Sequence, residues 1–178
     1  MNKLAYIAMA CGATLLALAS SARAQSMSAP AQPSAPVPAQ LLAAKSVFIA
    51  NGGYDAESLD QLQTKGDGRD APYDQIYAAM KTWGRYTLAS APADADLIFT
   101  IRLTSPLDGC GGNIPRSYYA PQLTLTIVDV KTHFTLWSIT EPVQSALLAS
   151  NWKKNFGSAI TALVNDVKNI VSVPGSAA

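Results

Sequence analysis

The chain has 178 residues, with 13 lysines and arginines, 12 aspartates and glutamates, one histidine and two cysteines. This near-neutral balance excludes the basic surface typical of proteins that bind nucleic acids or anionic lipids. One cysteine, Cys11, lies in an apolar N-terminal stretch. If that stretch is removed, Cys110 is the only cysteine left, and a core must stabilise the fold without an internal disulfide.

The first 24 residues predict a secretory signal peptide. Lys3 provides the positive charge, residues 4–19 are apolar or small, and the A-R-A sequence at 22–24 forms a cleavage motif before Gln25. Cys11 comes before the apolar run is complete, which argues against lipid attachment there. We expect a periplasmic or secreted protein without a stable membrane anchor after cleavage. An uncleaved N-terminal anchor is the alternative.

Three further segments follow the signal peptide. Residues 25–40 hold four prolines among alanine, serine and glutamine, and this composition is typical of an extended linker or disordered arm. Residues 41–172 are expected to form a single domain of ordinary size. Residues 173–178 are expected to be a disordered tail.

The first half of this domain predicts a strand, a polar loop and a helix. Residues 45–50 (KSVFIA) form a short apolar strand, which the Asn-Gly-Gly sequence at 51–53 is expected to stop. A polar loop covers 55–70. In the helix that follows, apolar side chains recur at spacings of three, one, three and three residues. They are Tyr73, Ile76, Tyr77, Met80 and Trp83. We expect Asp70 to cap this helix and Gly84 to end it.

The second half predicts four strands and one helix. Residues 86–90 and 95–103 form two strands, and a loop rich in glycine and proline covers 105–120. Residues 121–143 form a hairpin, because apolar and polar side chains alternate on both sides of a polar break at 129–133. A last helix, capped by Ser150 or Asn151, carries apolar side chains at spacings of three and four residues. They are Trp152, Phe156, Ile160, Leu163, Val167 and Ile170.

This order of elements predicts an α+β fold. Two amphipathic helices and about five strands can bury their apolar faces only against one another, which gives a two-layer sandwich. The hairpin indicates that the sheet is mainly antiparallel, with both helices packed on it.

Several stretches resemble a known group of proteins. The strand ADLIFTIRL at 95–103 is one, and LTLTIVDVKTHFTLWSIT at 123–140, with its D-x-x-T turn, is another. Together with residues 73–99, they are similar to exported envelope families of Gram-negative bacteria that share a fold with the TolB amino-terminal domain and the curli-secretion lipoprotein. The resemblance covers most of 41–172. It implies a non-catalytic envelope domain that docks other proteins, and it brings no functional residues with it.

The residue types that support catalysis or metal binding are sparse. His133 lies beside the hairpin turn, and as a general base it needs a nucleophile and an orienting group nearby. Cys110 is the one thiol candidate. Residues 67–70 lack the oxygen ligands of a calcium loop, and residues 109–113 match no phosphate-binding motif and precede no helix. We therefore predict no catalytic residues, no cofactor and no metal.

Two clusters are candidates for an interaction surface. Arg116, Tyr118 and Tyr119 lie in the loop at 105–120 and belong to residue types enriched where proteins meet. Trp152, Lys153 and Lys154 open the last helix, with cations at the end where the helix dipole disfavours them. The alternative is that the tyrosines cover the core and the lysines only aid solubility.

These observations favour an exported, non-enzymatic domain that serves as an interaction or assembly module for an envelope protein partner. One alternative is a carrier of a small apolar or peptide ligand between the sheet and its helices. A second alternative is a thiol enzyme that depends on Cys110.

Overall fold

The computed structural model of the chain describes residues 36–109 and 117–172. The expected signal peptide, most of the expected linker and the tail lie outside the described residues, as do Cys110 and Arg116. Within the described ranges, no helix has both the length and the apolar character that crossing a membrane requires. The domain boundaries drawn from the sequence stay a prediction.

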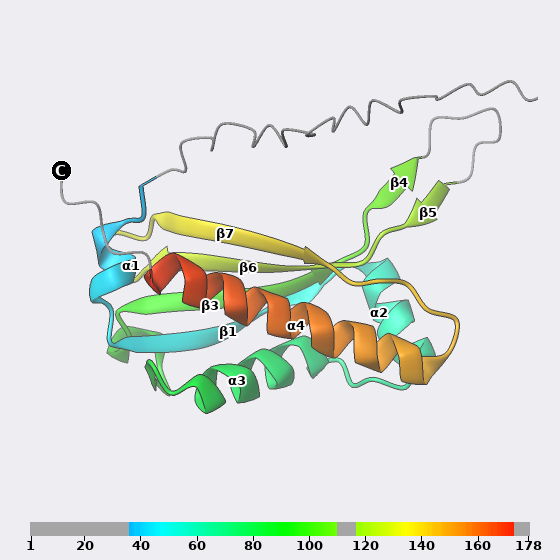
Figure 1. Ribbon diagram of the computed structural model, residues 1–178, viewed down its shortest axis with the longest axis horizontal. Helices are drawn as coiled ribbons and strands as arrows, with labels where there is room; N and C mark the ends of the chain where they lie inside the picture. The colour runs from blue at the N-terminus through cyan, green and yellow to red at the C-terminus, as the bar shows by residue number, and fades with distance from the viewer. Residues whose placement is uncertain (1–35, 110–116, 173–178) are drawn as a thin grey trace, which may run out of the picture. The chain divides into compact units, whose positions relative to one another are not determined.

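Five strands form one mixed sheet: Ser46–Tyr54 (β1), Thr87–Leu88 (β2), Leu97–Thr104 (β3), Gln122–Asp129 (β6) and Thr135–Pro142 (β7). Their order across the sheet is β2-β1-β3-β6-β7 (Figure 1). The strand β1 runs parallel to both of its neighbours, β2 and β3. From β3 to β6 to β7 the pairing is antiparallel, and the last two strands are the predicted hairpin, which is confirmed.

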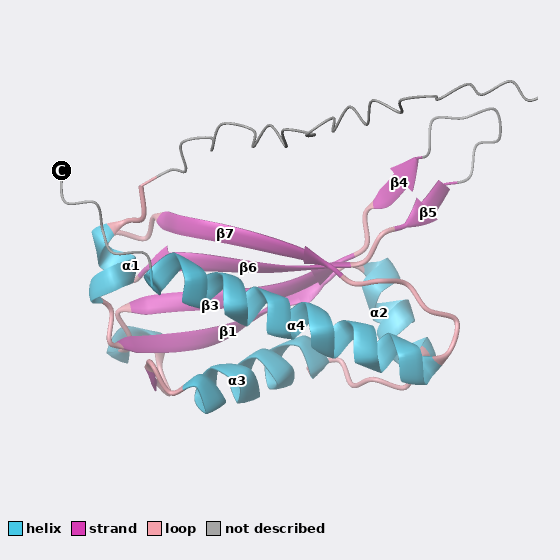
Figure 2. Cartoon of the chain, viewed as in Figure 1, coloured by secondary structure: helices cyan, strands magenta, loops and turns pink. Residues whose placement is uncertain are grey.

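The two longer helices, Ala71–Trp83 (α3) and Ala149–Ser172 (α4), pack side by side on one face of the sheet (Figure 2). They are the two helices that the sequence predicts. Two shorter helices, Ala39–Ala43 (α1) and Ala56–Thr64 (α2), and a 3-10 turn at Pro92–Asp94 (η1) complete the described elements. The predicted α+β two-layer sandwich with a five-stranded sheet is confirmed.

The core lies between the sheet and these helices. Alternate side chains of β3 and β6 face the helices because successive residues of a strand point to opposite faces. The predicted apolar stripe of α4 meets them, and these side chains fill the space between the two layers. Buried members include Leu97, Phe99, Ile101, Leu103, Leu123, Leu125 and Ile127 on the strands and Trp152, Phe156, Ile160, Leu163 and Val167 on α4.

The ends of α3 follow the sequence prediction in part. Gly84 ends the helix in the left-handed conformation, with φ of 69°, and its N–H donates to the carbonyl of Met80. Asp70 occupies the expected N-terminal position, but its side chain makes no capping bond. Its Oδ1 instead accepts a hydrogen bond of 2.9 Å from Nδ2 of Asn51. The prediction that Asp70 is the N-cap residue of α3 is therefore confirmed in position, although its side chain does not supply a capping bond.

The start of α4 also differs from the prediction. The helix begins at Ala149, ahead of both residues that were expected to cap it. Ser150 and Asn151 therefore lie inside its first turn, and the predicted cap is wrong.

The strand β1 does not stop at residues 51–53, as the glycines there predict, but continues to Tyr54. Its pairing with β3 shifts register between Asn51 and Tyr54, which is the signature of a β-bulge. A Cβ at Gly52 would lie 2.8 Å from Cγ2 of Thr100 and 2.9 Å from the carbonyl oxygen of Ile101. The glycine thus lets the two strands approach where any larger residue would collide.

Candidate interaction surface

Beyond the five-stranded sheet, Leu107–Gly109 (β4) and Ser117–Tyr119 (β5) form a separate antiparallel pair. This pair keeps the register of β3 and β6. Thr104 pairs with Gln122 and, three residues further along each strand, Leu107 pairs with Tyr119. Figure 1 shows the pair projecting beyond the ends of β3 and β6. We call these two strands the β4–β5 arm, and they lie in the stretch that the sequence predicts to be a loop.

Two prolines separate the arm from the sheet. Pro106 has no N–H, so it can accept a hydrogen bond from the opposite strand but cannot donate one. Its carbonyl accepts from Ala120 N at 3.0 Å. Pro121, on the other strand, accepts from Val143 N at 2.8 Å, on the side that faces β7. The arm therefore continues the register of the sheet, but Pro106 and Ala120 are joined by one backbone hydrogen bond because Pro106 cannot donate a second.

A polar cluster fixes the base of the arm to α2. Asp55 is the N-cap of this helix: its Oδ1 accepts from Ser58 N at 2.8 Å. Its Oδ2 accepts from Ser105 N at 2.7 Å, just before the arm begins. The hydroxyls of Ser58 and Ser105 are both buried and share a hydrogen bond of 3.0 Å. One carboxylate thus joins the start of α2 to the base of the arm.

The protonation state of Asp55 matches this role. Burial acts to raise the pKa of Asp55, but the hydrogen bonds from Ser58 and Ser105, with the charge of Arg102, outweigh it. The pKa of this carboxyl therefore lies below its ordinary value of 3.8. The ionised form, which accepts both backbone hydrogen bonds, is the form present at neutral and mildly acidic pH.

The arm exposes apolar and aromatic side chains on both faces. Leu107 is 61% exposed, Tyr118 49% and Tyr119 45%. Leu107 and Tyr119 are cross-strand partners and share one face, whereas Tyr118, the next residue along β5, points to the other. The sequence singles out both tyrosines. It does not single out Leu107, because only the register shows that this residue lies beside Tyr119.

The second predicted cluster needs a correction. Trp152 is 1% exposed: it packs in the core, and its Nε1 donates to Oδ2 of Asp67 at 3.1 Å. Trp152 is therefore not part of an exposed surface. Lys153 lies 3.6 Å from Oδ1 of the same carboxylate, with 53% of its side chain exposed, and Lys154 is exposed. The two lysines lie on α4, so they belong to a different element from the arm tyrosines.

The residues considered for catalysis or metal binding have other surroundings. His133 is exposed in the turn between β6 and β7, with φ of 61°, and its N–H donates to the carbonyl of Asp129. In the expected polar loop, Asp67 binds Trp152 and Lys153 as described above. The described residues contain no group of three or more side chains placed to hold a metal ion. The hypothesis of a thiol enzyme stays a prediction, because Cys110 lies outside the described residues.

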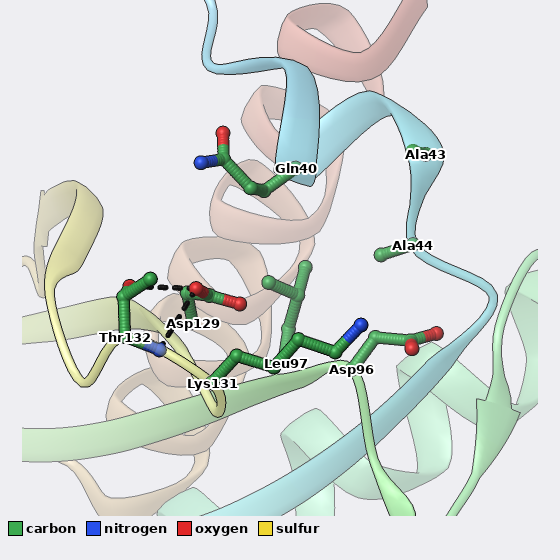
Figure 3. Close-up of a pocket in the computed structure, with 8 residues that line it drawn as sticks. All are labelled: Gln40, Ala43, Ala44, Asp96, Leu97, Asp129, Lys131 and Thr132. Atoms are coloured by element: carbon green, nitrogen blue, oxygen red, sulfur yellow. Dashed lines mark hydrogen bonds between the residues drawn. The ribbon is translucent and has the colours of Figure 1, made fainter.

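A surface pocket of about 410 Å³ lies at the opposite end of β3 from the arm (Figure 3). Its carboxylates are already engaged. Oδ2 of Asp96 accepts from both N and Oγ of Ser46 at 3.0 Å, and Oδ2 of Asp129 accepts from Oγ1 of Thr132 at 2.6 Å. Hydrogen bonds to these carboxylates lower the pKa of each. Asp96 joins β1 to β3 and Asp129 closes the β6–β7 turn, so we assign both a structural role.

Comparisons with known proteins give distant likenesses. No family model and no curated protein matches the sequence. A PelC dodecamer structure from Paraburkholderia phytofirmans is 15% identical over 76% of this chain and 95% of that chain, with a TM-score of 0.47. A DUF330 protein from Xanthomonas campestris is 13% identical over 78% and 89%, with a TM-score of 0.44. A lipoprotein from Neisseria meningitidis is 14% identical over 70% and 99%, with a TM-score of 0.35. The resemblance to the TolB amino-terminal domain stays a prediction.

Proposed function

We propose that this chain is an exported, non-enzymatic domain that binds a protein partner in the cell envelope through the β4–β5 arm. The observation that carries the proposal is the combination of a fixed base and an exposed apolar surface. Asp55 holds the base through Ser58 and Ser105, and the arm beyond it exposes Leu107 and Tyr119 on one face. Export is proposed from the signal peptide expected at residues 1–24.

The exposed side chains are of the kind that contribute most to binding. Tyrosine offers a large apolar ring with few rotatable bonds, and its hydroxyl can remain hydrated at the rim of an interface. A neighbouring leucine adds apolar area to the same face. Because β4 and β5 are already paired with each other, little conformational entropy of their backbone remains to be lost when a partner binds.

The core supports binding at the surface over carriage of a ligand between the layers. Phe99 on β3 and Trp152 and Phe156 on α4 are fully buried and occupy that space. A ligand there would have to displace closely packed side chains, which costs free energy.

A double variant of the arm tests this function. We expect Leu107→Ser/Tyr119→Ser to keep the urea midpoint and far-ultraviolet circular dichroism of the wild type, because both side chains are exposed. The variant protein is crosslinked with formaldehyde in intact cells, isolated and analysed by mass spectrometry. If each truncated contact contributes about 1–2 kcal/mol to binding, partner recovery falls at least ~10-fold.

The matched control is Phe134→Ser. Phe134 is 73% exposed but lies at the β6–β7 turn, away from the arm in the fold. This variant is expected to recover the same partner as the wild type. Equal recovery with the arm variant and the wild type would show that the arm is not the binding surface.

A further inference from the structure

The strand β7 is an edge of the sheet, and its outer side pairs with none of the described residues. No described strand lies beyond β7 in the sheet (Figure 2), and β7 is eight residues long. Val143 N donates toward β6, to the carbonyl of Pro121. Because backbone groups alternate in direction along an antiparallel strand, Ser138 and Thr140 direct their N–H and C=O groups outward.

This edge carries few of the features that usually prevent pairing. Exposed edges are commonly shortened, charged, interrupted by proline or covered. The other edge strand, β2, has only two residues and is protected by its shortness. The pairing of β7 with β6 shifts register between Ile127 and Val128, and Glu141 and Pro142 lie at the end of the strand, but the exposed Ser138 and Thr140 between these features are uncharged. The outward hydrogen-bonding groups in the middle of β7 thus have no strand partner among the described residues.

A groove lies between the end of β7 and α4. Its volume is about 420 Å³. Glu141 lines it from the strand, and the small side chains of Ser158, Ala159 and Ala162 line it from the helix. Small residues on α4 leave room for a side chain of a second polypeptide running along β7. An open edge beside a helix and a groove is an arrangement that lets added strands be selected by their side chains.

Glu141 is the one ionisable residue that lines this groove. Burial raises the pKa of Glu141, and the hydrogen bond and the charge of nearby Asp166 raise it further. None of the residues that line the groove is a lysine or an arginine. A basic side chain supplied by a partner would therefore relieve the repulsion between two carboxyl groups that no lining residue neutralises.

We propose that the outer edge of β7 and the β7/α4 groove bind an extended segment of a partner polypeptide. The segment pairs with Ser138 and Thr140 as a sixth strand and places a lysine or arginine beside Glu141 and Asp166. Main-chain hydrogen bonds supply affinity, and the basic side chain supplies specificity. This surface is separate from the β4–β5 arm, so either surface can bind without the other.

A phage-displayed library of random octapeptides, panned on the purified full-length protein, tests the proposal. We expect enriched peptides with a lysine or arginine at one fixed position, flanked by β-branched residues. Enriched peptides are then synthesised and measured by isothermal titration calorimetry. Glu141→Gln/Asp166→Asn is expected to weaken their binding at least ~10-fold, since the basic side chain of the peptide loses its acidic partners. N-methylation of alternate peptide amides should abolish binding in one register and leave it unchanged in the other.

Two variants test the strand edge and the groove separately, and one variant of the arm serves as the control. Ser138→Pro removes an outward N–H, and Ser158→Leu fills the groove from α4 without altering the strand. Both should lose the peptides, whereas Leu107→Ser/Tyr119→Ser should retain them. The proposal is overturned if no sequence is enriched, if enriched sequences lack a basic position, or if either Ser138→Pro or Ser158→Leu binds the peptides as tightly as the wild type. Loss of peptide binding in the arm variant would overturn it as well.

Discussion

Replacing Asp55 tests whether one carboxylate holds the base of the β4–β5 arm. In Asp55→Ala, α2 loses its N-cap, a loss that costs about 1 kcal/mol. The N–H of Ser105 also loses its acceptor at 2.7 Å, and an unsatisfied buried donor costs about 1–3 kcal/mol. We therefore expect the free energy of unfolding to fall by about 2–4 kcal/mol. Asp55→Asn keeps one acceptor oxygen and should lose roughly half as much.

The assay is urea denaturation followed by circular dichroism, together with amide hydrogen exchange of the arm. Exchange at Ala120, whose N–H donates to the carbonyl of Pro106 at 3.0 Å, is expected to accelerate more than exchange in the centre of β6, because the arm loses its anchor first. Asp60→Ala is the matched control, since Asp60 is exposed on the same helix and should change stability by less than ~0.5 kcal/mol. If Asp55→Ala resembles this control, or if arm exchange is unchanged, the carboxylate does not anchor the arm.

The effect of Asp55 also depends on pH. Its folded-state pKa lies below the ordinary value of 3.8, so the ionised carboxylate stabilises the fold above that pH. This contribution is lost as the pH falls through the folded-state pKa. The difference in unfolding free energy between the wild type and Asp55→Asn should be constant near neutral pH and shrink below pH 3.8. A difference that grows on acidification would contradict the assignment.

Three further substitutions test the fold around these surfaces. Gly52→Ala should lower the urea midpoint and cost about 1–3 kcal/mol, because its Cβ collides with β3; an unchanged midpoint would show that the strands can separate. Trp152→Phe should cost about 1–3 kcal/mol in the same titration, because the buried indole loses both its bond to Asp67 and part of its packing; an unchanged midpoint would contradict both contributions. Asp166→Asn should raise Tm at pH 7 but not at pH 3. The pKa of Glu141 is raised, so ionisation of Glu141 beside Asp166 lowers stability as the pH rises through that pKa, and at pH 3 Glu141 is protonated. A gain at both pH values would exclude charge repulsion as the cause.

The sequence predicts the elements that show strong periodicity. The strand β6 buries every second residue and α4 buries residues three and four apart, and those patterns are visible without a structure. The helix α2 was missed because only Ser58 and Leu62 among its residues are buried, which leaves no apolar stripe. Asp55 at its start was the available signal, since aspartate is a preferred N-cap.

The arm and the parallel pairing of β1 depend on contacts between distant residues. Leu107 and the two tyrosines lie among glycines and prolines, which favour a loop when the chain is analysed locally. Their strand character appears only when β3 and β6 are paired and the register is continued past Pro106. In the same way, Gly52 is typical of a turn until Thr100 is placed beside it. The sequence therefore indicates both tyrosines but not the partner strand that positions them.

Photocrosslinking in intact cells tests the central claim most directly. A photoreactive residue is placed at Tyr119 on the arm or, as the control, at Phe134 in the β6–β7 turn, and the products are identified by mass spectrometry. Both positions are exposed, so both can react with a bound neighbour. Binding through the arm predicts a single reproducible partner protein from Tyr119 that is absent from Phe134. No product from Tyr119, or the same products from both positions, would contradict it.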